Sequence, residues 1–127
     1  MATGEMKIVI GFLKDASAKF RDLKREAGIC LRQKRDSDGY KERLRERGRL
    51  LIDLEENLII PLSAMKGAEL DLAYEIRMQV ARFAGSAAEA LEENDNFALG
   101  VLLTHMGCKT GEENDLEKLI EYLEKKY

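Results

Sequence analysis

Few residues in this chain could act as nucleophiles or metal ligands. The 127 residues include one histidine, His105, and two cysteines, Cys30 and Cys108. A zinc site needs three or four convergent ligands, and these residues share no spacing typical of one. Di-iron bundles need two Glu-x-x-His units, whereas Leu102 stands three residues before the histidine. The sequence therefore predicts no metal, no cofactor, no catalytic residues and no enzymatic activity, and we expect His105 at the solvent-exposed end of a buried helix.

Two arginines occupy positions that do not suit a charge. On helical wheels, Arg47 and Arg77 both fall within apolar arcs. An unpaired buried charge costs several kcal/mol, so each guanidinium needs a carboxylate, contact with water or an anionic ligand. The pattern favours an internal ion pair, for instance Arg77 with Glu69. The alternative is a shared anion or phosphate pocket between the second and third helices, with Tyr74 as a hydroxyl donor.

Positive charge is concentrated between positions 21 and 49, which hold 11 basic and 6 acidic residues, although the whole chain has a net charge of -3. Lys41, Arg45 and Arg49 fall on one face of the predicted helix. Such a face would gain affinity for nucleic acid by releasing counterions. Acidic residues stand three positions before both arginines, and such pairs also stabilise a solvated helix. A solvated face is the favoured interpretation, and nucleic-acid binding is the alternative.

The first half of the chain has the periodicity of two long helices. From position 9, apolar residues recur at alternating steps of four and three, which predicts a helix that ends near Arg35. A second helix is expected to begin with Asp38 as its N-cap. It should break at 59–61, because Pro61 cannot donate a hydrogen bond to the preceding turn.

Three more helices are expected in the second half. The pattern at 62–93 is a narrow polar stripe between two apolar seams, which predicts a helix surrounded by neighbours. A short apolar helix at 97–106 should end at Gly107. Thr110 and Glu113 match a capping box at the start of the last helix. The apolar face of that helix is predicted at Leu116, Leu119, Ile120, Leu123 and Tyr127.

These patterns predict an all-α fold. We expect an elongated helical bundle of about five helices, with the third helix central, formed by residues 1–127 as a single domain. No apolar run approaches the length that crosses a bilayer, so no membrane partner is expected. The two cysteines have no spacing typical of a disulfide framework, which favours a cytoplasmic protein.

The first helix suggests a function. Apolar residues beside its main seam widen the seam beyond what one partner helix needs. We therefore expect self-association through this helix, in the manner of a coiled coil, with Phe12, Leu13, Phe20 and Leu31 at the interface. The predicted function is a non-enzymatic protein–protein interaction or scaffold module, forming a homo-oligomer or binding a protein partner. The alternative is an RNA- or DNA-binding helical protein that uses the region 21–49.

Overall fold

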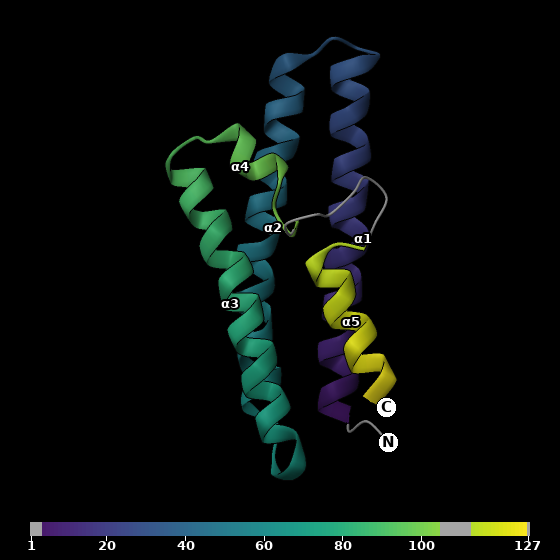
Figure 1. Cartoon of the computed structure of the whole chain (residues 1–127), viewed down its shortest axis with the longest axis vertical. Helices are drawn as coiled ribbons and strands as arrows, with labels where there is room; N and C mark the ends of the chain where they lie inside the picture. Colours follow the sequence, from purple (N-terminus) through teal and green to yellow (C-terminus); the bar gives the residue numbers. More distant parts are fainter. Residues whose placement is uncertain (1–3, 105–112, 127) are drawn as a thin grey trace.

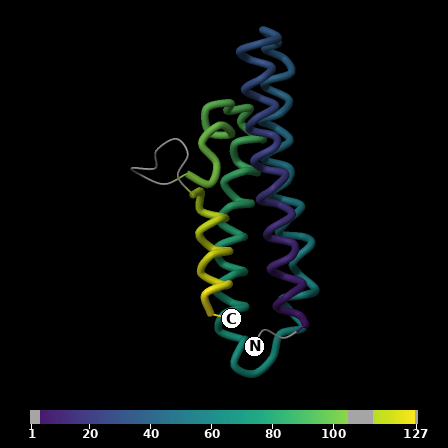
Figure 2. Tube along the Cα trace, turned by 90° about the vertical axis from the view of Figure 1, so that its right-hand side faces the viewer, coloured from purple at the N-terminus to yellow at the C-terminus, as the bar shows by residue number. Residues whose placement is uncertain are grey.

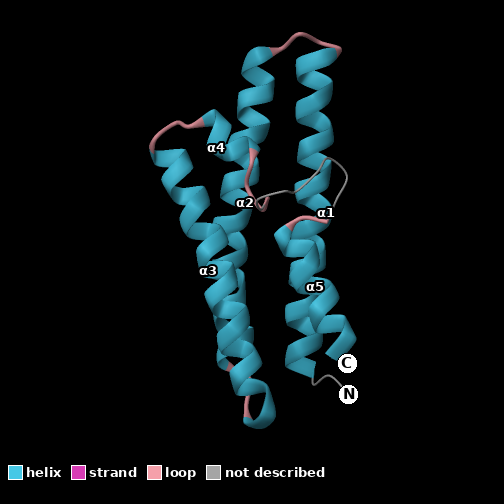
Figure 3. Cartoon of the chain, viewed as in Figure 1, coloured by secondary structure: helices cyan, strands magenta, loops and turns pink. Residues whose placement is uncertain are grey.

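The computed structural model describes residues 4–104 and 113–126. In these residues it contains five α-helices, one short 3-10 helix and no β-strand (Figure 3). The predicted all-α helical bundle is confirmed. The predictions made for His105, Gly107, Cys108, Thr110 and Tyr127 concern residues outside the described ranges.

Helix α1 (Gly4–Arg32) buries the predicted seam. Its buried residues follow the four-and-three spacing except at Leu23, which is half-buried, and with two additions, Met6 and Ser17. They are Met6, Val9, Leu13, Ala16, Ser17, Phe20, Ala27 and Cys30. The helix ends three residues before Arg35, which adopts a left-handed backbone with φ of 50°. The amide of Asp36 then donates to the carbonyl of Cys30 at 2.7 Å, which closes the end of the helix.

Helix α2 (Ser37–Ser63) differs from the prediction at both ends. Its N-cap is Asp36, whose Oδ1 accepts a hydrogen bond from the amide of Gly39 at 2.9 Å, so the predicted cap at Asp38 is wrong. The predicted break at 59–61 is also wrong, because α2 continues through Pro61. The proline lies in the last turn, where its missing N–H removes only one bond from a helix that ends two residues later.

The chain then turns through the 3-10 helix η1 (Gly67–Glu69) into α3 (Leu70–Glu92). Helix α4 (Asn96–Gly100) is shorter than the predicted 97–106, and Leu103 beyond it has a left-handed φ of 64°. Its N-cap is Asp95, whose side chain accepts from the amide of Ala98 at 3.0 Å.

Helix α5 (Asp115–Lys126) begins with a reciprocal cap four residues after the predicted one. The side chain of Asn114 accepts from the amide of Glu117 at 2.8 Å, and the carboxylate of Glu117 accepts from the amide of Asn114 at 2.9 Å. The two bonds satisfy amides that a helix start otherwise leaves without partners.

Helix α2 is the central helix of the bundle. It packs against α1 on one side and against α3 and α4 on the other, as Figure 1 shows. The prediction that the third helix is central is therefore wrong, because α3 has α2 and α4 as its main neighbours and leaves one side uncovered. The core lies along α2, where Leu44, Leu51 and Leu58 are fully buried.

Helix α5 packs antiparallel on α1. Lys14 pairs with Glu124 at 2.9 Å, and Arg21 pairs with Glu117 at 2.5 Å. The two α1 residues are seven positions apart, and their partners on α5 are seven positions apart in the opposite order, as antiparallel packing requires. This pairing holds the last helix beside the first.

The hairpin formed by α1 and α2 extends past the other helices. Its closed end, at the α1–α2 turn, projects beyond α3, α4 and α5 (Figure 2). The α2–α3 turn lies at the opposite end of the molecule (Figure 1). The α1–α2 turn and the α2–α3 turn therefore lie at opposite ends of the bundle.

Candidate functional site

A row of apolar and small residues runs along the uncovered side of α3. We call Leu70, Tyr74, Met78, Ala81, Gly85 and Ala88 the α3 stripe. Its three large side chains are four residues apart and are 57%, 63% and 54% exposed, respectively. A Cβ built on Gly85 would meet nothing within 4 Å. All of them except Gly85 belong to the second apolar seam that the sequence shows, and the described part of the chain leaves the three large side chains exposed.

The predicted interface on α1 is only partly available. Leu13 and Phe20 are buried in the core of their own chain, so a second copy could contact them only if that core opened. Phe12 and Leu31 are exposed. They are 19 residues apart along α1, about 28 Å at 1.5 Å per residue, and do not form one patch.

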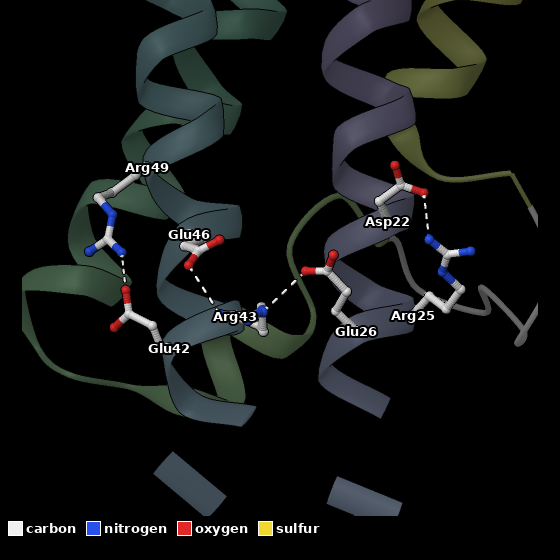
Figure 4. A network of polar contacts seen from close by, with 7 residues as sticks. All are labelled: Asp22, Arg25, Glu26, Glu42, Arg43, Glu46 and Arg49. Atoms are coloured by element: carbon white, nitrogen blue, oxygen red, sulfur yellow. Dashed lines mark hydrogen bonds and ion pairs between the residues drawn. The ribbon is translucent and has the colours of Figure 1, made fainter. Parts of the chain in front are cut away.

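The predicted nucleic-acid face on α2 is partly engaged by ion pairs, because Arg45 and Arg49 share the one carboxylate of Glu42. Arg49 contacts Glu42 at 2.6 Å (Figure 4). Arg45 lies 4.0 Å from the same carboxylate and donates a hydrogen bond to Asn94 at 3.1 Å. Lys41 is exposed and has no acidic partner in the described ranges. The structure therefore leaves one of the three predicted cations free.

Arg43 joins the two helices of the hairpin. Its guanidinium lies 3.1 Å from Glu26 of α1 and 3.3 Å from Glu46 of α2, as Figure 4 shows. On α1, Arg25 also pairs with Asp22 at 3.4 Å. These pairs engage Asp22, Glu26 and Glu46 in the part of the hairpin next to its closed end, which we call the shaft.

Other cations, which the sequence analysis did not single out, are free at the end of the hairpin. Arg32, Lys34 and Arg35 are exposed and have no ion pair with a described residue. With Lys41 they form what we call the tip cluster. Lys34 and Arg35 fall at the end of the first predicted helix, whereas the predicted basic face lies on the second helix, so the wheel of neither helix shows this cluster.

Arg47 is buried as its wheel position predicts, with 5% exposure. Its guanidinium carbon lies 4.1 Å above the ring of Phe20, and Nη1 donates to the carbonyl of Gly100 at 3.4 Å. Its Nε is buried without a hydrogen-bond partner. Burial away from water lowers the pKa of Arg47 well below its usual range, to about 10, and a weaker interaction with Tyr40 raises it.

The predicted pocket shared by two arginines does not form. Arg77 and Tyr74 are exposed on α3, and Arg47 lies under α4. Arg77 makes no ion pair with a described residue, so the expected pair with Glu69 is also wrong. Arg77 reaches water because α3 is not surrounded by neighbours.

The described residues contain no group of three or more His, Cys, Asp or Glu side chains that could hold a metal ion. Cys30 is a buried thiol. Within 4–104 and 113–126, no helix offers a stretch long and apolar enough to span a bilayer.

Protein-family models, curated proteins and solved structures gave no match to this chain.

One further group of shifted carboxyls lies on the surface. A hydrogen bond with Glu121 raises the pKa of Glu113, and a hydrogen bond from Lys125 lowers the pKa of Glu121. Lys125 lies 2.9 Å from Glu121, and its own pKa is raised by that contact. All three side chains are exposed, so this group stabilises the surface of α5 modestly at most.

Proposed function

We propose that the protein is a non-enzymatic interaction module that self-associates, with a second copy packing on the α3 stripe. The observation that carries this proposal is the exposure of Leu70, Tyr74 and Met78 on one line of one helix. Three large apolar side chains in a row on a helix surface are typical of an interface rather than of scattered surface residues.

The order of residues along the stripe favours a second copy as the partner. The large side chains occupy the first half of α3, and Ala81, Gly85 and Ala88 occupy the second half. When two such helices pack antiparallel, the large residues of each face the small residues of the other. A two-fold interface needs this kind of self-complementary surface, and small residues let helices approach closely.

The outer surface of α1 contributes less to this proposal than the sequence suggested. Two of its four expected interface residues, Leu13 and Phe20, are buried within the chain. Self-association through α1 would require the chain to open its own core. Packing on α3 requires no rearrangement.

Light scattering coupled to size-exclusion chromatography, from low to high micromolar protein, tests the proposal. We expect twice the mass of one chain at high concentration. Tyr74→Glu should give a monomer with unchanged helical circular dichroism, because the side chain is exposed. The matched control is Ile60→Glu, on α2, where a side chain that is 81% exposed is replaced. This control should still dimerise. A wild-type monomer at high micromolar concentration, or equal loss in both variants, would contradict the proposal.

A further inference from the structure

The tip cluster lies where an extended ligand can reach it without touching the rest of the molecule. Arg32 ends α1, Lys34 and Arg35 lie in the turn, and Lys41 lies in the second turn of α2. Figure 2 shows this end of the hairpin projecting beyond the other helices. Outside positions 21–49 the chain has 10 basic and 18 acidic residues, so the tip points away from a predominantly acidic body.

The charge of the tip cluster is not neutralised locally. Asp36 caps α2 through the amide of Gly39. The nearest carboxylates further along the hairpin, Glu26, Glu42 and Glu46, are engaged by arginines of the shaft. Asp38 is the one remaining acidic residue between Arg32 and Lys41. Four cations without ion pairs therefore lie near two carboxylates, Asp36 and Asp38, which leaves this end of the hairpin with a net positive charge.

The backbone of Arg35 also favours a role for its charge. Its φ of 50° places it in the left-handed region, where helices usually end with glycine because other residues are strained. An arginine here keeps a cation at the apex of the turn at a cost in backbone energy. Strained residues of this kind cluster at functional positions.

From these observations we propose that the tip cluster binds the phosphate backbone of a nucleic acid. The two guanidinium groups can each donate two hydrogen bonds to one phosphate, and the two ammonium groups act as point charges. Each phosphate that is neutralised releases condensed counterions, which supplies the binding free energy. This site is independent of the α3 stripe.

The shape of the tip limits what it can recognise. Two helices side by side, each about 10–12 Å across, are wider than the major groove of about 12 Å. The tip therefore contacts the backbone and does not read base edges. The one aromatic residue at this end, Tyr40, is half-buried, so stacking on bases is not expected. Binding should not depend on sequence.

A nucleic acid fits the tip better than an anionic membrane does. Binding to a bilayer surface typically combines basic residues with a broad apolar face that inserts between lipids. The tip offers one exposed large apolar side chain, Leu31. A phosphodiester chain requires no inserted apolar surface.

Fluorescence anisotropy with labelled single- and double-stranded oligonucleotides, at several salt concentrations, tests this proposal. Four phosphate contacts predict that log Kobs falls against log salt with a slope of about -3 for single strands and about -4 for duplex. The triple variant Arg32→Gln, Lys34→Gln and Arg35→Gln keeps one of the four phosphate contacts, that of Lys41. We expect its slope to fall to about -1 and its affinity at low salt to drop at least tenfold.

The matched control removes three positive charges elsewhere, through Lys7→Gln, Lys19→Gln and Lys66→Gln. These lysines are exposed and lie outside the tip. The control should bind with the slope of wild type, and Tyr74→Glu should bind like wild type because the two surfaces are separate. Equal losses in the two triple variants would overturn the proposal, as would absence of binding by wild type at low salt. Tighter binding to anionic phospholipid vesicles than to either oligonucleotide would also overturn it.

Discussion

Replacing Arg47 by Met tests whether a buried guanidinium stabilises this fold. Desolvation lowers its pKa well below its usual range, to about 10, and a tenfold change in acid dissociation corresponds to about 1.4 kcal/mol. The folded state therefore disfavours the charged form by about 3 kcal/mol at pH 7, relative to the unfolded chain. Methionine, which is similar in length and uncharged, removes this cost.

The substitution also removes two favourable contacts. A desolvated cation over an aromatic ring contributes about 2 kcal/mol, which applies to the contact with Phe20 at 4.1 Å. The long hydrogen bond to Gly100, at 3.4 Å, contributes about 1 kcal/mol at most. We therefore expect Arg47→Met to leave the free energy of unfolding unchanged or to raise it by about 1 kcal/mol.

Urea denaturation followed by circular dichroism measures the difference between wild type and Arg47→Met. The folded-state pKa is lower than that of the unfolded chain, so above pH 10 the folded state releases the proton first. Stability contributed by this group then rises with pH. At pH 11 wild type should gain about 1 kcal/mol relative to Arg47→Met, because the groups common to both proteins cancel.

The control is Arg49→Met, which removes an exposed arginine and should change the unfolding free energy by less than about 1 kcal/mol. A loss of more than about 2 kcal/mol in Arg47→Met, with no relative change between pH 7 and 11, would refute the reasoning. The guanidinium would then stabilise the fold despite its burial.

Three further substitutions have defined outcomes. Phe83→Ala should cost about 3 to 5 kcal/mol in urea denaturation, because the ring is buried in the core; a near-neutral result would contradict its placement. Arg35→Gly should raise the free energy of unfolding by about 0.5 kcal/mol, because glycine adopts a left-handed backbone without strain, and it should weaken oligonucleotide binding in the anisotropy assay. A lower free energy of unfolding would contradict the inference that the backbone of Arg35 is strained. Asn114→Ala should cost about 1 kcal/mol in a thermal or urea melt by removing the cap of α5, whereas Asn114→Ser should restore most of it.

The sequence predicts the core of α1 well, because the spacing of apolar residues depends only on helix geometry. It does not predict which apolar face of α3 is covered. Both faces of that helix carry apolar residues, and coverage depends on where the neighbouring helices lie. Pro61 illustrates a related limit, since the effect of a proline depends on how far the helix continues beyond it.

Charge pairing is also poorly predicted by local spacing. Glu42 pairs with Arg49, seven positions away, and Arg43 reaches Glu26 on another helix. These contacts depend on how α1 and α2 pack. The free cations of the tip cluster could be recognised only after the paired ones had been identified.

The position of α5 has a consequence for the order of folding. Helices α1, α2 and α3 are joined as neighbours along the chain, whereas Arg21 and Glu117 are 96 positions apart. Closing so long a loop costs entropy that the contacts of one twelve-residue helix must offset. We expect α5 to dock last and to open first. Its amide protons should exchange with solvent well before those of α2, even under conditions in which the three long helices remain folded.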